Sequence, residues 1–295
     1  KMAHRAGFVT IVGRPNVGKS TLLNALVGAK LAAVSPKPQT TRNRIAGIRT
    51  LPQAQVVFLD TPGIHAARSA LNRRMVDVAK RALGEAEVVL LVLDASAGIT
   101  TPDRELAATV AAMTVPTVVV LNKIDRLPRL ALLPVMAEIA TLLPDREIVP
   151  ASARKGDSVP VVLDVVAKLL PEGPRLFPED EYTTETERFL AQEIVREQVF
   201  LATKEEVPYA TAVVVESFEP KPERHVVVIG ATILVERPNH KGILLGTGGQ
   251  QLKEIGQRAR RELETLLGTR VFLELFVRVE PGWARNSRRL DELGI

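Results

Sequence analysis

The sequence contains no cysteine, so disulfide bonds and thiolate metal sites are excluded. It also has no apolar run close to the ~18 residues that a membrane-spanning helix requires. The apolar run at residues 88–95 is interrupted by Asp94, and the N-terminal stretch "KMAHRAG" lacks the apolar segment of a signal peptide. Internal repeats and low-complexity tracts are absent as well. These absences lead us to expect the cytoplasm as the compartment.

The chain is long and basic. Its 295 residues favour two domains, because single domains usually span about 100 to 200 residues. Residues 1–180 hold 23 Lys and Arg against 16 Asp and Glu, whereas residues 181–295 hold 16 against 18. A basic protein favours a polyanionic partner, although solubility and phosphate binding explain the N-terminal surplus equally well. A nucleic-acid site in the second part must therefore be a local patch.

The first part alternates β-branched apolar runs with helical stretches, which indicates βαβ units in an α/β domain. We expect a mostly parallel sheet with helices on both faces, and an antiparallel strand at 45–50 beside 55–60. The other predicted strands are 8–13, 55–60, 88–94, 117–122 and 146–152. The predicted helices are 19–28, 70–84, 102–113, 130–142 and 158–170. Polar residues collect at the carboxyl ends of these strands, where such sheets bind ligands.

A segment rich in proline and acidic residues at 171–183 is typical of a linker. We therefore expect a first domain at 1–172, a linker at 173–184 and a second domain at 185–295. The second domain is predicted to be α+β, in the order α-β-β-α-α-β. Its elements are a helix at 184–203 capped by Thr184 or Thr186, strands at 210–219 and 224–236, helices near 241–246 and 250–268, and a strand at 270–280.

The stretch "GRPNVGKS" (13–20) matches the P-loop pattern G-x-x-x-x-G-K-[ST] between a predicted strand and a predicted helix. Its backbone amides and the helix N-terminus are suited to phosphate groups. Lys19 is expected to reach the β- and γ-phosphates, and Ser20 to bind Mg²⁺. The predicted phosphate-binding residues are Gly13, Arg14, Pro15, Asn16, Val17, Gly18, Lys19, Ser20 and Thr21.

A P-loop alone is compatible with a kinase, an ATPase or a GTPase, and "NKID" (122–125) narrows the choice. A carboxylate accepts two hydrogen bonds in one plane, which matches N1–H and N2–H₂ of guanine but not adenine. We therefore expect Asp125 to read a guanine base, Asn122 to tie the loop together and the Lys123 stem to cover the base. Backbone amides of the "SAR" stretch complete the predicted pocket, at Ser152, Ala153 and Arg154.

The stretch "DTPGI" (60–64) ends another strand predicted to lie across from the P-loop. We expect Asp60 to act on Mg²⁺ through water and the amide of Gly63 to approach the γ-phosphate, with Thr61, Pro62 and Ile64 in the same turn. A threonine of "PQTTRNR" (38–44) is expected to bind Mg²⁺ only in the triphosphate state, and we favour Thr41 over Thr40. The predicted catalytic residues are Lys19, Thr41, Asp60 and Gly63.

Together these motifs resemble the translation-factor-like branch of GTPases over about 170 residues. That branch includes members with a hydrophobic residue where Ras-like proteins have the glutamine that positions water, and Ile64 stands there. The resemblance implies that a backbone carbonyl or a bridging water orients the attacking water. It also implies that Asn16 binds a K⁺ ion, with backbone near 32–38 completing that site.

In the second domain, "GTGG" (246–249) lies between two predicted helices. In KH domains a G-x-x-G loop joins two helices and clamps the backbone of about four unpaired nucleotides. The element order is the one expected of the type II KH fold. Trp283, the only tryptophan, is interpreted either as a base-stacking residue or as a core anchor. The predicted RNA-binding residues are Lys241, Gly246, Thr247, Gly248, Gly249, Lys253, Trp283 and Arg285.

A GTPase domain followed by a KH domain resembles the bacterial Era family, and the segments 193–200, 240–256 and 279–286 look like Era segments. The resemblance implies binding of GTP or GDP with Mg²⁺, binding to the 3′ end of small-subunit ribosomal RNA, and a role in assembly of that subunit. It leaves peripheral membrane association open. Thr247 and Arg154 depart from the family, which more often has lysine at both places.

Two alternatives remain open. A GTPase with two GTPase domains and a KH-like domain is disfavoured, because the sequence has a single P-loop motif. A membrane-associated signalling GTPase whose second domain binds protein would have no affinity for RNA. We expect the protein to be a monomer.

Overall fold

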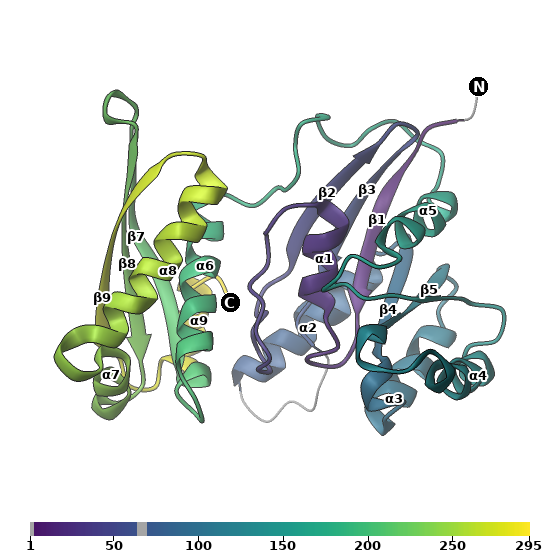
Figure 1. Ribbon diagram of the computed structural model, residues 1–295, viewed down its shortest axis with the longest axis horizontal. Coiled ribbons are helices and arrows are strands. Elements are labelled where there is room, and N and C mark those ends of the chain that lie inside the picture. The colour runs from purple at the N-terminus through teal and green to yellow at the C-terminus, as the bar shows by residue number, and fades with distance from the viewer. Residues whose placement is uncertain (1–2, 64–69) are drawn as a thin grey trace. The chain divides into compact units, whose positions relative to one another are not determined.

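The structure is a computed structural model that describes residues 3–63 and 70–295 (Figure 1). It contains two compact units. Most of the described residues up to Thr184 belong to the first unit, and the second contains Glu185–Ile295 together with Ala32–Thr40. The sequence does not predict that residues 32–40 belong with the second unit. The domain boundaries given above stay a prediction.

The first unit is built on a six-stranded sheet in the order β2-β3-β1-β4-β5-β6. All neighbours pair in parallel except β2 and β3, which pair antiparallel as predicted. The strands are β1 (Arg5–Val12), β2 (Ile45–Leu51), β3 (Ala54–Asp60), β4 (Val88–Asp94), β5 (Thr117–Asn122) and β6 (Glu147–Pro150). The helices are α1 (Lys19–Val27), α2 (Ala70–Gly84), α3 (Thr101–Ala111), α4 (Leu132–Leu142) and α5 (Val159–Leu169).

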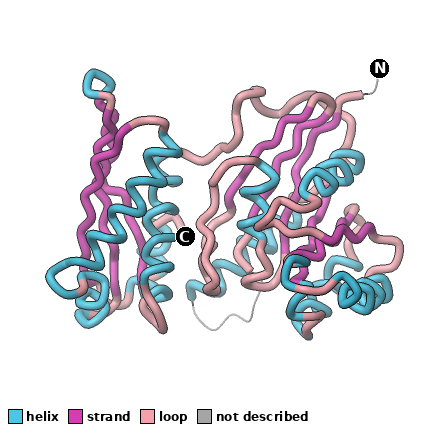
Figure 2. The backbone as a smooth tube through the Cα atoms, in the orientation of Figure 1, coloured by secondary structure: helices cyan, strands magenta, loops and turns pink. Residues whose placement is uncertain are grey.

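Helices cover this sheet because its central strands are apolar on both faces. Every residue of β3, β4 and β5 is buried. Helices α1 and α5 contact each other and the strands β1 and β3. A separate core joins β4 and β5 to α2, α3 and α4 through Leu83, Leu106 and Ile139. Figure 2 shows the strands as a continuous sheet flanked by helices, which confirms the predicted α/β class.

The predicted linker is bound to the edge of this sheet. The Gln55 side chain donates to the Phe177 carbonyl at 2.9 Å and accepts from the Phe177 amide at 2.9 Å. Farther along, the Ile48 amide donates to the Tyr182 carbonyl at 2.8 Å, and Thr183 forms an antiparallel bridge with Gly47. The linker thus covers part of β2, whose unpaired backbone groups would otherwise remain open to another strand.

The second unit has helices packed on a three-stranded sheet in the order β7-β8-β9. Strands β7 and β8 pair antiparallel, and β8 and β9 pair parallel. This confirms the α-β-β-α-α-β order, to which the chain adds the short helix α9. The elements are α6 (Glu187–Ala202), β7 (Thr211–Lys221), β8 (Val226–Val235), α7 (Pro238–Leu245), α8 (Gln250–Leu267), β9 (Arg270–Val279) and α9 (Ser287–Glu292).

Local sequence explains how the long helices of this unit begin and pack. Helix α6 starts after Thr186, whose hydroxyl accepts a hydrogen bond from the Phe189 amide at 3.1 Å, so Thr186 is the cap. Helix α8 buries Ile255, Ala259 and Leu263, the apolar positions spaced three or four apart. No helix among the described residues combines the length and apolar character needed to cross a membrane.

Candidate guanine-nucleotide site and RNA-binding loop

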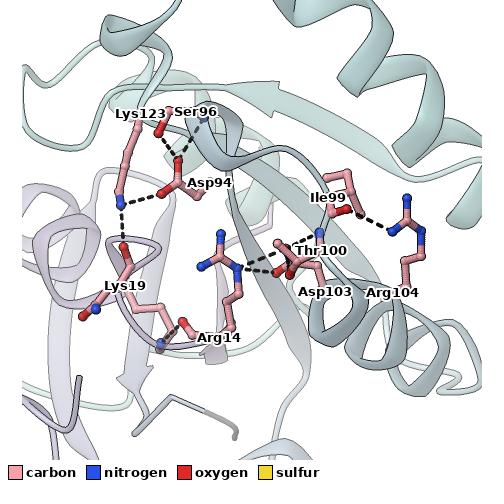
Figure 3. Close-up of polar contacts among 10 residues, drawn as sticks. Arg14, Lys19, Asp94, Ser96, Ile99, Thr100, Asp103, Arg104 and Lys123 are labelled. Carbon is pink, nitrogen blue, oxygen red and sulfur yellow. Dashed lines mark hydrogen bonds and ion pairs between the residues drawn. The ribbon is translucent and has the colours of Figure 1, made fainter. Parts of the chain in front are cut away.

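The P-loop connects β1 to α1, and Lys19 is the first residue of that helix. Its side chain is 6% exposed, and Nζ donates a hydrogen bond to the Arg14 carbonyl at 2.9 Å (Figure 3). Burial lowers the pKa of Lys19 to about 8; the charge of Asp60 opposes this shift, and the charges of Arg14 and Lys123 add to it. A bound phosphate would supply the negative charge that this buried amine lacks.

Three oxygen donors meet beside the P-loop. Ser20 Oγ donates to Asp60 Oδ2 at 2.7 Å and lies 2.7 Å from Thr41 Oγ1. The Thr40 hydroxyl instead donates to the Lys37 carbonyl at 2.7 Å. The structure thus brings together the three residues predicted to act on Mg²⁺, and it favours Thr41 over Thr40.

This set of donors fits Mg²⁺. Hydroxyl and carboxylate oxygens are hard donors, and Mg²⁺ in nucleotide sites usually takes one or two protein ligands and completes its shell with phosphates and waters. Asp60 is fully buried, so its carboxylate is held in one place at the end of β3. Ser20 and Thr41 would hold the ion directly, and Asp60 would act on it through water.

The turn after β3 lies against the P-loop. A Cβ atom on Gly63 would be 2.7 Å from Pro15 N and 2.8 Å from Pro15 Cα, so any larger residue would displace backbone. Thr61 Oγ1 donates to the Ile11 carbonyl at 2.7 Å and holds the start of this turn to β1. Ile64 lies outside the described residues. The close approach supports the prediction that the Gly63 amide reaches the γ-phosphate position.

The predicted base pocket forms where β5 and β6 end. Asn122 Nδ2 donates to the Val17 carbonyl at 2.9 Å, and the Ala153 amide donates to Asn122 Oδ1 at 2.9 Å. Ser152 Oγ donates to Asp125 Oδ1 at 2.8 Å, and this hydrogen bond holds the pKa of Asp125 below its usual value. An ionised Asp125 retains the acceptor capacity to bind guanine N1–H and N2–H₂.

The remaining predicted nucleotide contacts differ in exposure. Gly13 and Val17 are buried, whereas Arg14, Pro15, Gly18 and Thr21 are partly exposed. Asn16 and Arg154 are exposed, so their side chains are available to a ligand or to solvent. The backbone of Asn16 has a φ of 66°, in the left-handed region, which turns the chain around the loop.

In the second unit, the "GTGG" loop joins α7 to α8 as predicted. Gly248 and Gly249 have φ angles of 60° and 77°, which favour glycine, and a Cβ at either would meet no atom within 4 Å. The space beside the loop is therefore open. Thr247 and Lys253 are exposed, and Lys241 is partly exposed. Cations thus flank an open glycine loop between two helices, the arrangement expected of an RNA clamp.

Comparison with known proteins supports both sites. Residues 8–123 match the family described as 50S ribosome-binding GTPase, and residues 206–284 match the KH domain. The GTPase Era of Geobacter metallireducens is 51% identical over 98% of this chain and 97% of its own length. The GTPase Era of Nitratidesulfovibrio vulgaris is 44% identical over 99% of this chain and 97% of its own length. The chain belongs to the Era family of GTPases.

Solved Era structures have the same fold. Aquifex aeolicus Era, in a variant bound to GDP·AlF₄⁻, has a TM-score of 0.95 and 45% identity, covering 98% of this chain and 99% of that one. Era in complex with MgGDPNP and nucleotides 1506–1542 of 16S ribosomal RNA also has a TM-score of 0.95 and 45% identity, with 99% of both chains covered. As an Era-family GTPase, the protein acts on GTP and uses Mg²⁺.

Asp94 contributes to the Era-type nucleotide site, although none of the sequence motifs includes it. Asp94 ends β4 and forms an ion pair with Lys123 at 2.6 Å (Figure 3). The Lys123 ammonium also donates to the Asn16 carbonyl. Burial raises the pKa of Asp94, but hydrogen bonds from Lys123 and Ser96 outweigh it and hold that pKa below the usual value. Asp94 thus fixes Lys123 over the P-loop. In the sequence, the position of Asp94 at the carboxyl end of a predicted strand was the one feature that pointed to a role in the site.

Asp103 was also missed. It is fully buried at the start of α3, where its carboxylate accepts from the Thr100 amide at 3.0 Å and from Arg14 Nε at 3.1 Å. The ion pair orients the P-loop arginine away from Lys19 (Figure 3). In the sequence, Thr100 and Asp103 have the spacing of a helix cap, which gives no hint of the contact with Arg14.

Trp283 lies in the core of the Era-type second unit. It is 1% exposed, and Nε1 donates to the Ala210 carbonyl at 3.2 Å. This burial fits the core interpretation, and a base can stack on the ring only if the turn opens. Arg285, two residues later, is exposed and remains available to RNA.

Proposed function

We propose that the protein binds the 3′ end of small-subunit ribosomal RNA and that GTP controls this binding during assembly of the subunit. The observation that carries the proposal is the full-length likeness to Era in complex with MgGDPNP and nucleotides 1506–1542 of 16S ribosomal RNA. The open "GTGG" loop between α7 and α8 provides a place for unpaired nucleotides.

Nucleotide binding divides between two groups of residues. Lys19 and the P-loop amides hold the β- and γ-phosphates, and Asp125 holds the guanine base. Asn122 joins the two groups, because its side chain contacts both Val17 and Ala153. A triphosphate bound in this way is fixed at both ends before hydrolysis begins.

Hydrolysis transfers the γ-phosphoryl group to water, so catalysis requires positioning and charge neutralisation. Ser20 and Thr41 would hold Mg²⁺ directly and Asp60 through water, and the bound ion would neutralise negative charge on the phosphates. Lys19 donates to the same phosphates, and the Gly63 amide donates to the γ-phosphate. The aliphatic side chain of Ile64 can neither donate nor accept a proton. As the family resemblance implies, a backbone carbonyl or a bridging water orients the attacking water.

We also propose that Asn16 contributes to a K⁺ site that supplies positive charge near the phosphates. The side chain of Asn16 is exposed at the P-loop, and an amide oxygen is a suitable ligand for K⁺. GTP hydrolysis should be faster in KCl than in NaCl, and Asn16→Ala should remove the difference. Equal rates in the two salts, with no effect of the substitution, would show that K⁺ has no role here.

RNA binding is tested by fluorescence anisotropy with a labelled single-stranded RNA of the sequence of nucleotides 1506–1542 of 16S ribosomal RNA. We expect tighter binding in the GDPNP state than in the GDP state. Gly248→Asp places a carboxylate beside the RNA phosphates and should weaken binding at least tenfold by like-charge repulsion. Glu223→Asp, an exposed change in the β7–β8 turn, serves as the control. No binding to this RNA would instead favour a signalling GTPase whose second domain binds protein.

We propose that the protein is a cytoplasmic monomer. A part of it is proposed to associate peripherally with the membrane. Cell fractionation followed by immunoblotting measures the division between soluble and membrane fractions. Gel filtration with light scattering measures the molecular mass in solution, which for a monomer is 32.1 kDa.

A further inference from the structure

Helix α6 buries an unusual number of charged side chains. Glu193, Arg196 and Glu197 are each 3–4% exposed, although a helix that only packs on a sheet would bury apolar residues there. Buried charges are costly unless they are paired and hydrogen-bonded. The segment 193–200 resembles the family, yet it belongs neither to the nucleotide site nor to the "GTGG" loop described above.

The Arg196 guanidinium has partners on all sides. Its Nε donates to Glu193 Oε1 at 3.1 Å, its Nη2 is paired with Glu193 Oε2, and its carbon lies 5.6 Å from the centre of the Phe200 ring. Its Nη1 donates to the carbonyl of Thr40. Glu193 therefore holds the guanidinium in one orientation, and the donor that remains is aimed at a backbone carbonyl 156 residues earlier.

Two further contacts fix the same segment to the helix. The Val34 amide donates to Glu197 Oε1 at 3.2 Å. The Lys37 ammonium donates to the carbonyls of Phe200 and Thr203 at the end of α6, where a helix has carbonyls without helical partners and a negative dipole end. These contacts explain why Ala32–Thr40 belongs to the same compact unit as α6.

The carbonyl that Arg196 binds belongs to Thr40, the residue directly before the predicted Mg²⁺ ligand Thr41. Thr40 C=O and Thr41 N belong to one planar peptide group, so fixing that oxygen fixes the plane from which Thr41 extends. Only the φ and χ1 angles of Thr41 then remain to place its hydroxyl, which lies 2.7 Å from Ser20 Oγ. Arg196 thus constrains the position of a predicted Mg²⁺ ligand without contacting it.

The other end of α6 is connected to the RNA-binding loop. Gln251 follows that loop at the start of α8, and its Nε2 donates to the Ala202 carbonyl, in the last residue of α6, at 2.9 Å. Gly246 lies directly against Gln251, because a Cβ on Gly246 would be 2.8 Å from the Gln251 Cβ. A continuous chain of contacts therefore leads from the Thr40 carbonyl along α6 to the "GTGG" loop.

We propose that Arg196, oriented by Glu193, is a positioning residue that couples Thr41 to the RNA-binding loop through α6 and Gln251. Thr41 is fixed when it binds Mg²⁺ beside a triphosphate, and the Thr40 carbonyl then holds Arg196 and α6 in the arrangement that supports the loop. Loss of the γ-phosphate releases Thr41 and with it this constraint. The coupling rests on the proposed function, since it requires that GTP control RNA binding.

The coupling is measured as the ratio of the RNA dissociation constants in the GDP and GDPNP states of the full-length protein. The probe is the single-stranded RNA of nucleotides 1506–1542 named above. Arg196→Met alone would leave the buried Glu193 unpaired, so the main variant is the double change Glu193→Leu and Arg196→Met, because apolar replacement of both partners of a buried pair is often neutral for stability. Gln251→Ala tests the far end of the route, and Arg196→Lys retains one donor.

Arg188→Met is the matched control. Arg188 also lies on α6 and also donates to backbone carbonyls, those of Val215 and Glu216 at 3.0 and 2.8 Å. These carbonyls belong to strand β7 and not to the segment 32–40. Because linkage is reciprocal, the preference of the protein for GDPNP over GDP should rise on RNA addition by the same factor. A residue with only a structural role would change the melting temperature and leave both ratios intact.

Allosteric ratios of about 5 to 150 are typical, and we expect wild type and Arg188→Met to lie in that range. In the double variant and in Gln251→Ala, the ratio of RNA dissociation constants should fall close to one, while RNA affinity in the GDP state stays unchanged. Arg196→Lys should keep part of the wild-type ratio. The double variant should also require more Mg²⁺ for half-maximal GTP hydrolysis. If wild type has a ratio above five and the folded double variant keeps it, the coupling through Arg196 is wrong while the proposed function stands. A wild-type ratio of one contradicts the proposed function itself.

Discussion

Lys19 is a buried amine whose charge depends on its ligand. In the free protein burial lowers the pKa of Lys19 from 10.5 to about 8. Phosphates bound beside the amine favour the charged form and raise this pKa again. Above pH 8 the free protein has released the proton that the complex retains, so nucleotide binding must take up a proton.

We therefore predict that GTP affinity falls as the pH rises above 8 and that binding at pH 8.5 takes up roughly three quarters of a proton. Isothermal titration calorimetry in two buffers of different ionisation enthalpy measures this uptake. Lys19→Arg keeps its charge at every working pH and should show no uptake. Equal uptake by the two proteins would mean that another group titrates.

Asp60 and Ile64 stand four residues apart in the sequence and should differ greatly in importance. The Asp60 carboxylate accepts a hydrogen bond from the Ser20 hydroxyl at 2.7 Å and carries the negative charge that a Mg²⁺ site needs. Asp60→Asn should slow single-turnover GTP hydrolysis by about 100-fold or more, comparable to losses at other sites that stabilise transition-state charge. Ile64→Ala should slow it less than about fivefold, because the aliphatic chain does not hold the water. Similar losses in the two variants would require a direct role for Ile64.

The nucleotide site was largely predictable because its residue types stand in fixed spacings that a phosphate or a base imposes. Ser20, Thr41 and Asp60 lie together beside the P-loop, and Asp125 contacts Ser152 where β5 and β6 end. Asp94 and Asp103 were missed because each has an ordinary local explanation, the end of a strand or the cap of a helix. Their contacts with Lys123 and Arg14 join residues far apart in sequence, and no local spacing encodes such pairs.

At the scale of elements, substitutions can test which threonine caps the N-terminus of α6. The sequence left Thr184 and Thr186 as alternative caps, and the hydrogen bond from the Phe189 amide selects Thr186. Thr186→Ala should lower the free energy of unfolding by about 1 kcal/mol, the usual cost of losing a threonine cap. Thr184→Ala, at an exposed position before the helix, should change it by less than about 0.5 kcal/mol.

Chemical denaturation followed by circular dichroism measures both values, with GDP and Mg²⁺ kept saturating so that the first unit stays folded. A larger loss for Thr184→Ala than for Thr186→Ala would place the start of the helix earlier in the chain.

Periodicity predicted the long elements well, since β-branched runs and apolar residues at helical spacing reflect burial directly. It failed for short or irregular pieces. Helix α9 has only six residues, too few for a repeating pattern, and it was not predicted. The segment 32–40 has no regular structure, and its contacts with α6 depend on Arg196 and Lys37 in a way that no periodicity records.

For the whole molecule, charge distribution decides how RNA affinity depends on salt. Residues 181–295 hold 16 basic and 18 acidic side chains, so the domain as a whole does not attract RNA. Three local cations, Lys241, Lys253 and Arg285, are available for phosphate contacts. Each contact contributes a slope of about −0.7 to a plot of log affinity against log salt for a single strand, which predicts a total near −2.

Lys253→Ala should reduce that slope by about 0.7, whereas Lys221→Ala, which removes a cation from the β7–β8 hairpin of the same unit, should leave it unchanged. Fluorescence anisotropy over a series of KCl concentrations gives both slopes. A slope of −5 or steeper would mean that many more cations contact the RNA than this loop provides.

The position of residues 32–40 also has a consequence for biosynthesis. Thr40 and Arg196 are 156 residues apart, and translation at about 5 to 20 residues per second takes roughly 8 to 30 s to cover that distance. During this interval most of the first unit has emerged and can fold, while the segment that completes the second unit waits for α6. Folding of the second unit therefore cannot finish before the first has been made. A fragment that begins at residue 185 would lack the segment 32–40. It would therefore expose the charged face of α6 that this segment covers.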